Sequence, residues 1–331
     1  MKIPLALLLL PTSALLLGVD VRMWVTDETM QPIAGAKTMI AFTTIVHGGD
    51  ATFDGLTDRA GVFFARGRAQ HSVIIDADKD GHYKAHFDRL PRDRDWNLTV
   101  VLPRVINPIP LLARESTVWK APRDGQPREL EISGETIGFD FAMGEMVAPY
   151  GKGQIADVLF KIRNEFKGWK YSDRDMEETR RAPINRNTSE SNLKFYHGKF
   201  DAELGISFPG AQEGLVEEKD HFLPYSRLKM PHRAPETGYA PTWHYTANTY
   251  SPSTARDDVG FFLRARVKLD KEGRIVSANY AKIMGDFRLD ARGSISFTYY
   301  FNPTPNDRNL EFDPKRNLFP ASVQGADVRD P

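Results

Sequence analysis

The chain has 331 residues, of which 41 % are hydrophobic and 27 % charged, a globular composition that excludes a disordered or fibrous protein. Its 44 basic residues balance 44 acidic ones, so it lacks the positive charge expected of a nucleic-acid-binding protein. It contains no cysteine, which excludes disulfides, thiolate zinc sites, iron–sulfur clusters and cysteine nucleophiles.

The first 18 residues have the pattern of a secretory signal peptide. One positive charge at Lys2 precedes a short apolar run, which Pro11 interrupts and which ends at the small residue Gly18. No later segment reaches the length of a membrane span. We therefore expect residues 1–18 to be removed and the mature form to be secreted or periplasmic and not membrane-spanning. Export together with the absence of cysteine favours a bacterial protein. An uncleaved anchor is the alternative.

Residues 19–103 are predicted to form short strands separated by turns. Val19, Val21, Met23 and Val25 alternate with more polar residues, which is the period of a half-buried strand. Further strands follow at intervals of about 8–12 residues, the spacing typical of a β-sandwich.

Four stretches in this region resemble the carboxypeptidase regulatory-like domain: Val25–Asp27, Gln31–Ala36, Leu56–Asp58 and Gly61–Phe63. The resemblance implies a transthyretin-like β-sandwich over residues 19–103. It also implies an accessory or structural module, and no catalytic residue comes with it.

Residues 104–136 contain several prolines and are predicted to be an ordered strap between domains. Residues 137–320 are predicted to form a second, larger antiparallel β-sandwich. Its charged stretch 167–191 is expected to be a surface helix or an excursion with little core, and strands are expected over 193–208. The tail, residues 321–331, is expected to be frayed.

The clearest strand pattern lies at residues 261–269, where apolar residues alternate with Phe262, Arg264, Arg266 and Lys268. We expect the three basic side chains to form a solvated row, or a strip that docks an acidic polymer or a partner. Strands returning at 275–284 and 294–301 complete an antiparallel meander.

The segments Asn107–Pro110, Val147–Gly153 and Phe301–Phe319 are similar to uncharacterised exported proteins of environmental and gut bacteria. This resemblance implies one architecture over the whole mature chain and supplies no chemistry.

Familiar catalytic patterns are missing from the sequence. No zinc-peptidase motif surrounds any histidine, and no nucleophile elbow is present, although a Ser/His/Asp triad assembled in space stays open. Asp76–Gly81 matches the first half of a calcium loop, but Phe87 stands where the closing glutamate belongs, which favours a structural turn. We assign neither a cofactor nor a metal.

The most unusual stretch is residues 221–250, which is rich in proline and in aromatic residues and is predicted to be a long loop. Aromatic faces with polar tips suit a sugar or peptide ligand. The candidate ligand-binding residues are Tyr225, His232, Tyr239, Trp243, His244 and Tyr245. The alternatives are that these rings pack as a minor core, or that His221, His232 and His244 bind a metal.

The sequence therefore predicts an all-β protein with two sandwiches. Its favoured function is that of a non-catalytic exported binding or structural protein, with a surface protein or a glycan as the partner. The alternative is an extracellular or periplasmic glycan-directed hydrolase with a site at residues 221–250, which two close carboxylates near Trp243 would favour. A third possibility is pure assembly through an exposed strand edge or an apolar patch.

Overall fold

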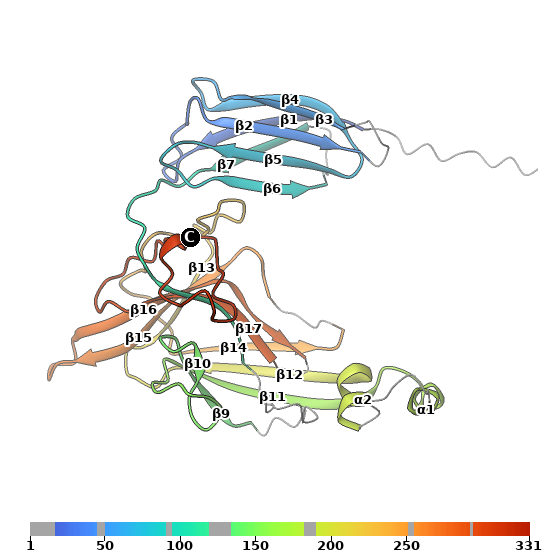
Figure 1. Cartoon of the computed structure of the whole chain (residues 1–331), viewed down its shortest axis with the longest axis vertical. Coiled ribbons are helices and arrows are strands. Elements are labelled where there is room, and N and C mark those ends of the chain that lie inside the picture. Colours follow the sequence, from blue (N-terminus) through green and yellow to red (C-terminus); the bar gives the residue numbers. More distant parts are fainter. Residues whose placement is uncertain are drawn as a thin grey trace, which may run out of the picture. The chain divides into compact units, whose positions relative to one another are not determined.

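In the computed structural model, residues 17–44, 50–90, 95–118, 134–181, 190–250, 255–291 and 294–331 are described. The chain divides into two compact units: Met1–Val105 with Tyr225–Arg227, and Ile106–Pro224 with Leu228–Pro331. Regular structure in both is almost entirely β-strand, which confirms the predicted all-β class (Figure 1). Neither α-helix in the described ranges has the length and apolar character needed to cross a bilayer. The predicted signal peptide lies outside these ranges, apart from its last two residues.

The first unit is a sandwich of two sheets. Its strands are β1 (Leu17–Thr26), β2 (Lys37–Thr43), β3 (Ala51–Leu56), β4 (Val62–Ala69), β5 (Ser72–Asp78), β6 (Ala85–Arg89) and β7 (Asp95–Val101). One sheet has the order β4-β1-β7, with β7 parallel to β1, and the other is antiparallel with the order β3-β2-β5-β6. The predicted alternation in β1 is confirmed, because Val19, Val21, Met23 and Val25 are at most 1 % exposed and lie in the core.

Residues 225–227 complete the first unit from a distant part of the chain. The backbone N–H of His86 in β6 donates to the carbonyl of Tyr225 at 2.9 Å. The ring of Tyr225 packs on Phe87, with 4.4 Å between the ring centroids. This segment therefore covers the edge of β6 as an added strand would.

The second unit is a sandwich of two five-stranded sheets, with strand orders β10-β9-β11-β12-β14 and β13-β15-β16-β17-β8. The strands are β8 (Leu112–Val118), β9 (Thr136–Asp140), β10 (Glu145–Met146), β11 (Val158–Trp169), β12 (Gly198–Ser207), β13 (Gly214–Glu218), β14 (Thr242–Asn248), β15 (Gly260–Leu269), β16 (Ile275–Asp290) and β17 (Ser294–Asn302). Between the sheets, Phe139, Phe160, Phe287 and Phe297 pack with neighbouring centroids 5.3–6.0 Å apart. We call this the inner core.

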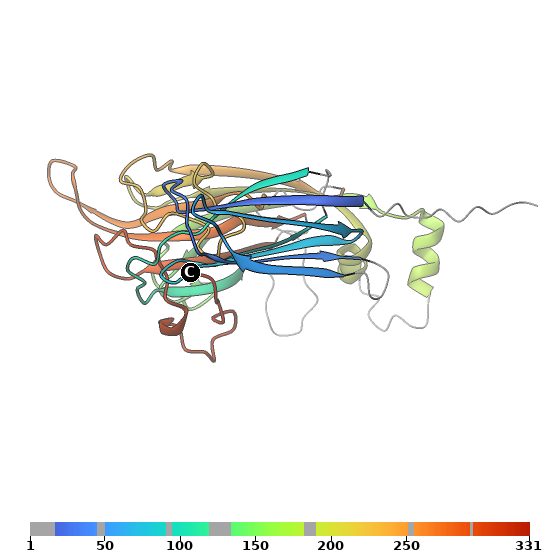
Figure 2. The same ribbon diagram turned by 90° about the horizontal axis from the view of Figure 1, so that it is seen from above.

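Two helices and a short 3-10 turn (Pro314–Arg316) complete the second unit. Helix α1 (Asp173–Arg181) forms within the charged stretch, which agrees with one of the two expectations, and projects at one end of the unit (Figure 2). Met176 of this helix is buried, and the guanidinium of Arg180 lies 5.5 Å from the ring centroid of Trp169 in β11. Helix α2 (Glu190–His197) ends directly before β12. The prediction of strand from residue 193 is therefore wrong up to His197.

The sheet containing β16 also has an apolar outer face, which segments from elsewhere in the chain cover. The outer core consists of Leu111, Ala113, Phe222, Met230, Ala234, Phe262, Ala278, Tyr280, Tyr300, Leu310 and Phe312. Part of the stretch predicted as an aromatic loop thus supplies a second layer of packing.

Two further segments differ from the sequence expectation. Residues 112–118 of the predicted strap form β8, which pairs with β17. The tail is ordered along this strand: the N–H of Glu115 donates to Gly325 at 2.8 Å, and the Tyr300 hydroxyl donates to the Asp330 carbonyl at 3.0 Å. The prediction of a frayed tail is therefore wrong.

A β-bulge interrupts the alternation of β15 at Arg266, whose φ is +53°. Before the bulge, Ala265 faces the inner core and Arg264 lies on the outer side. At the bulge, Arg266 turns toward Asp157, while Val267 packs against the outer core. The predicted solvated row is wrong for both arginines, and only Lys268 is exposed.

Candidate functional site

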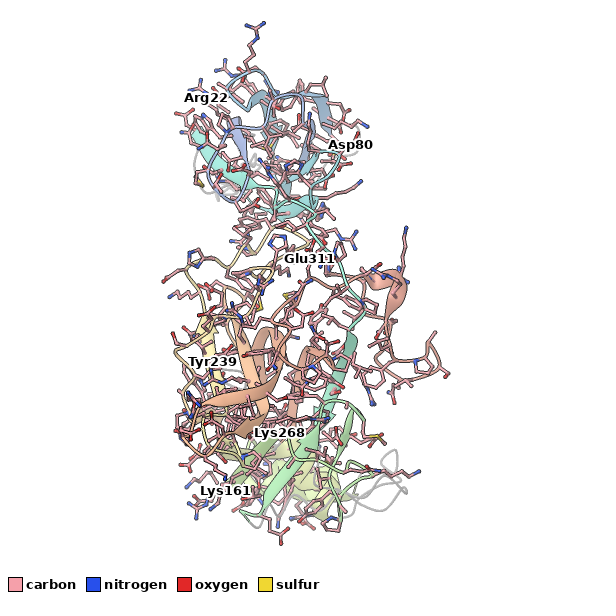
Figure 3. All side chains as sticks on the ribbon, turned by 90° about the vertical axis from the view of Figure 1, so that its left-hand side faces the viewer. Arg22, Asp80, Lys161, Tyr239, Lys268 and Glu311 are labelled. Atoms are coloured by element: carbon pink, nitrogen blue, oxygen red, sulfur yellow. The ribbon has the colours of Figure 1, made fainter. Side chains whose placement is uncertain are left out.

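The outer face of the sheet β4-β1-β7 presents two aromatic rings among polar side chains. Arg22 and Trp24 point away from the core because they alternate with its buried residues along β1. Arg22 is exposed, Trp24 is half-buried, and Phe64 of β4 is 47 % exposed. Together with the exposed Asn97 and Thr99 of β7, these residues form what we call the Trp24 face (Arg22 is labelled in Figure 3).

The strand register arranges the Trp24 face in two adjacent rows. Arg22 lies opposite Phe64 on one side and Asn97 on the other, and Trp24 lies opposite Thr99. The guanidinium of Arg22 is 5.9 Å from the Phe64 ring centroid, so the ring helps to orient it. Trp24 is the diagonal neighbour of Phe64, a separation of roughly 7–8 Å that large side chains can bridge.

A charged row borders this face. Asp20 accepts two hydrogen bonds from the guanidinium of Arg66, both at 2.5 Å. The hydrogen bond from Arg66 holds the pKa of Asp20 below its usual range. Asp95 of β7 lies opposite Asp20. Because Arg66 is largely exposed, this pair adds little to stability, and its polar atoms stay open to solvent.

The arrangement can bind a flat ligand that has an apolar surface and hydroxyl groups around its edge. An indole ring offers a large, rigid apolar surface for stacking. The guanidinium, amide and hydroxyl beside it can fix the orientation of such a ligand by hydrogen bonds.

The six side chains predicted for an aromatic site lie in separate environments. Tyr225 packs against the core of the first unit. In the second unit, Tyr245 lies in the inner core and Trp243 packs against it, whereas His244 between them is exposed on the other side of β14. Because β14 is a strand, the prediction of one continuous long loop is wrong here.

The two remaining predicted residues belong to the layer over the outer core. Tyr239 packs against it, donates its hydroxyl to the carbonyl of Pro235 at 2.8 Å and lies 4.3 Å from the guanidinium of Arg264. Burial raises the pKa of Tyr239. His232 has Nε2 3.9 Å from a carboxylate oxygen of Glu311. Tyr239 therefore has the packing role that the sequence left open beside ligand binding.

Tyr245 anchors a polar network at the rim of the inner core. Its hydroxyl donates to Asp286 at 2.5 Å, and burial, with this bond, raises the pKa of Tyr245. Arg256 donates to Asp286 at 3.0 Å and to Glu217 at 2.7 Å. One guanidinium thus binds both Asp286 and Glu217, which ties β13, β14 and β16 together.

Several of the histidines and aspartates considered for metal binding contact other charged side chains, and His244 is exposed on β14. His221 pairs with Glu218. In the possible calcium loop, Asp76 contacts His86 at 2.6 Å and Asp78 contacts Lys84 at 2.8 Å. Within the described ranges, no group of three or more potential ligands is placed to share a metal ion.

A cavity of about 260 Å³ lies beside the ordered tail. Its walls include Glu115, Met284 and Tyr300 from three neighbouring strands, and residues 327–330 from the tail. This cavity was not predicted from the sequence, because the tail was expected to be frayed.

No family model and no curated protein matches the chain. Similar solved structures include chlorocatechol 1,2-dioxygenase from Pseudomonas putida (14 % identity, TM-score 0.23, 26 % of this chain and 60 % of that one). A DUF3823 family protein from Parabacteroides merdae has 8 % identity, a TM-score of 0.19, and coverage of 86 % and 98 %. A proposed carbohydrate-binding protein from Bacteroides uniformis has 7 % identity, a TM-score of 0.19, and coverage of 87 % and 98 %.

The chain spans 60 % of the dioxygenase's length. The resemblance of residues 19–103 to the carboxypeptidase regulatory-like domain stays a prediction.

The Trp24 face was not singled out from the sequence, although part of its signal was visible. Alternation in β1 already placed Arg22 and Trp24 on the side away from the core. What the sequence could not show is the pairing of β1 with both β4 and β7, which brings Phe64 and Asn97 to the same surface.

Proposed function

We propose that this protein is a non-catalytic binding protein that recognises a carbohydrate at the Trp24 face. The observation that carries the proposal is an exposed sheet surface on which two aromatic rings lie beside a guanidinium, an amide and a hydroxyl. A sugar ring matches this surface, since it combines an apolar C–H face with hydroxyl groups around its edge.

We infer that the protein acts outside the cytoplasm, as the signal-peptide pattern of residues 1–18 predicts. Cleavage after Gly18 would leave Val19 as the first residue. Val19 is 1 % exposed and lies in the core of the first unit. The expected processing would therefore remove the first two residues of β1 and keep the core residues described in that strand, which begin at Val19.

The glycan-directed hydrolase receives less support. Glu217 and Asp286 lie near the predicted aromatic site, but both are bound by Arg256, and Asp286 also accepts a hydrogen bond from Tyr245. A general acid and a nucleophile or base must instead face the glycosidic bond from separate positions.

The test is a binding survey of neutral and charged polysaccharides by affinity electrophoresis and calorimetry, with Trp24→Ala as the diagnostic variant. We expect at least one polysaccharide to bind, and Trp24→Ala to weaken its affinity tenfold or more, which corresponds to about 1.4 kcal/mol. Leu56→Ala is the matched control, because Leu56 is 62 % exposed but belongs to the other sheet of the same unit. Equal affinity of Trp24→Ala and the wild type, or no binding to any member, would contradict the proposal.

A further inference from the structure

A lysine amine is buried in the outer core without a hydrogen-bond partner. Lys282 lies within β16, opposite Phe262 of β15 and Tyr300 of β17. The residue is 0 % exposed, and its Nζ atom makes no hydrogen bond within the described part of the chain. Buried polar groups are nearly always paired, so this amine calls for an explanation other than packing.

The groups around the amine offer it little compensation. Nζ lies 4.7 Å from the centroid of the Tyr300 ring. The charge of Glu311 acts on Lys282, but the carboxylate of Glu311 accepts hydrogen bonds from the backbone N–H groups of Ile106 at 2.9 Å and Asn107 at 2.7 Å. The negative charge of Glu311 is therefore already stabilised by these two backbone N–H groups (Glu311 is labelled in Figure 3).

Two segments form a cover over this part of the outer core, residues 228–234 and 308–312. Hydrogen bonds join their backbones: the N–H of Leu310 donates to the carbonyl of His232 at 2.7 Å, and the N–H of Ala234 donates to the carbonyl of Arg308 at 2.9 Å. Both segments add apolar side chains to the outer core.

Other titratable or charged groups belong to the elements packed against Lys282. Arg233 and Arg308 lie in the cover itself, where Arg308 pairs with Glu236 at 2.6 Å. The imidazole of His232 lies in the cover and approaches Glu311. Tyr280 lies two residues before Lys282 in β16, and Arg264 of β15 lies opposite Tyr280. The guanidinium of Arg264 is bound to backbone carbonyls at 2.8 and 3.0 Å.

Burial lowers the pKa of Lys282 to about 7, only partly offset by the charge of Glu311. Above this pH the neutral amine is tolerated in apolar surroundings. Below it, an ammonium ion would be enclosed without water, which is strongly unfavourable. The most accessible relief is local opening of a segment that lies over the sheet, since such openings require less free energy than global unfolding.

We propose that the cover formed by residues 228–234 and 308–312 opens when Lys282 becomes protonated, so that acid exposes the outer face of the sheet around Phe262 and Tyr300. This device is independent of carbohydrate binding at the Trp24 face.

The sign of the effect follows from proton linkage. The pKa of Lys282 in the folded chain lies below its ordinary value of 10.5, so the unfolded or opened chain binds more protons between about pH 7 and 10.5. The free energy of opening therefore rises with pH across this window. The contribution of Lys282 to the free energy of opening is lowest below about pH 7.

The test is amide hydrogen exchange at pH 6.0 and 8.5, corrected for the intrinsic exchange rate at each pH. We expect protection of the N–H groups of Leu310 and Ala234 to fall at least tenfold at pH 6.0 in the wild type. Lys282→Met should show no such fall, since its side chain cannot be charged. His232→Gln should keep the response, which separates the effect of the lysine from that of the imidazole in the cover.

Unchanged protection in the wild type would overturn the proposal. So would a response that persists in Lys282→Met, or one that disappears in His232→Gln. Should Lys282→Met fail to fold, ¹⁵N NMR of the Lys282 side chain in the wild type decides. Its titration midpoint must coincide with that of the opening, and a midpoint near 10 would refute the proposal.

Discussion

Arg266 adopts a left-handed backbone conformation and uses it to reach across the inner core. Its guanidinium donates to both carboxylate oxygens of Asp157, at 2.7 and 2.9 Å, and to Asp140 at 2.9 Å. Burial raises the pKa of Asp157 despite this partner. The carboxylate of Asp157 is thus stable in its charged form only while the guanidinium is present.

We therefore predict that Arg266→Met lowers the free energy of unfolding by about 3–5 kcal/mol, because it leaves the carboxylate of Asp157 buried without its cation. Denaturant unfolding measures the change. Lys268→Met is the control, since Lys268 is exposed on the same strand and should change stability by no more than about 0.5 kcal/mol. A loss below about 1 kcal/mol for Arg266→Met would show that this ion pair is dispensable.

Arg266 also shows the limit of predicting the orientation of single side chains from the sequence. Alternation over residues 261–269 indicated the strand and its inner side correctly as far as Ala265, but it did not indicate that the other side, with Phe262 and Arg264, is buried as well. The bulge changes which side of the sheet the residues after Ala265 face. The residue types around Arg266 do not indicate this bulge, because its partners Asp140 and Asp157 are distant in the chain. Burial of Lys282 was equally hidden, since it depends on a cover formed by other segments.

At the scale of elements, the ordered tail depends on a close approach between Gly325 and β8. Gly325 has φ of +79°, and a Cβ atom there would lie 2.3 Å from the carbonyl oxygen of Glu115. Only glycine can both adopt this conformation and let the two backbones meet.

Gly325→Ala should therefore detach the tail and lower the melting temperature by several degrees, measured calorimetrically, with faster proteolysis of the tail. Gly273→Ala supplies the comparison. Gly273 has a similar φ of +78°, but a Cβ atom there would meet nothing within 4 Å. If the two variants behaved alike, backbone strain alone would explain the effect, and the contact with β8 would be unimportant.

Elements with clear periodicity were predictable, and those defined by distant partners were not. The strands at 19–26 and 261–269 follow from apolar alternation. Strand β14 was hidden, because its alternating Trp243, Tyr245 and Ala247 lie in a stretch whose prolines and aromatic rings indicated a loop. Strand β8 was concealed among prolines, and only pairing with β17 makes it a strand.

At the scale of the whole molecule, two separate cores predict two unfolding events, and Tyr225 belongs to the first of them. Its ring packs on Phe87 and lies 5.1 Å from the guanidinium of Arg89.

Tyr225→Ala is expected to destabilise the first unit by about 2–4 kcal/mol, because a large, partly buried ring is removed and Phe87 loses its cover. Calorimetry should show one transition moving down while the other stays in place. Phe287→Ala, a change in the inner core, should have the opposite selectivity. A shift of the second transition by Tyr225→Ala would contradict its assignment to the first unit.

The all-β class followed from strand spacing and turn residues alone. The candidate site did not, because a binding face requires the register of three strands that are not neighbours in the chain. The packing of residues 225–227 in the first unit could not be predicted either, since no sequence feature distinguishes Tyr225 from the other aromatic residues around it.

The contribution of residues 225–227 to the first unit affects how the gene for such a protein can recombine. Recombination moves continuous stretches of a gene, whereas the first sandwich is encoded in two stretches, residues 1–105 and 225–227. A copy transferred with the first stretch alone would arrive with the edge of β6 bare and the ring of Phe87 uncovered. The two sandwiches are therefore expected to descend together, as a pair rather than as interchangeable modules.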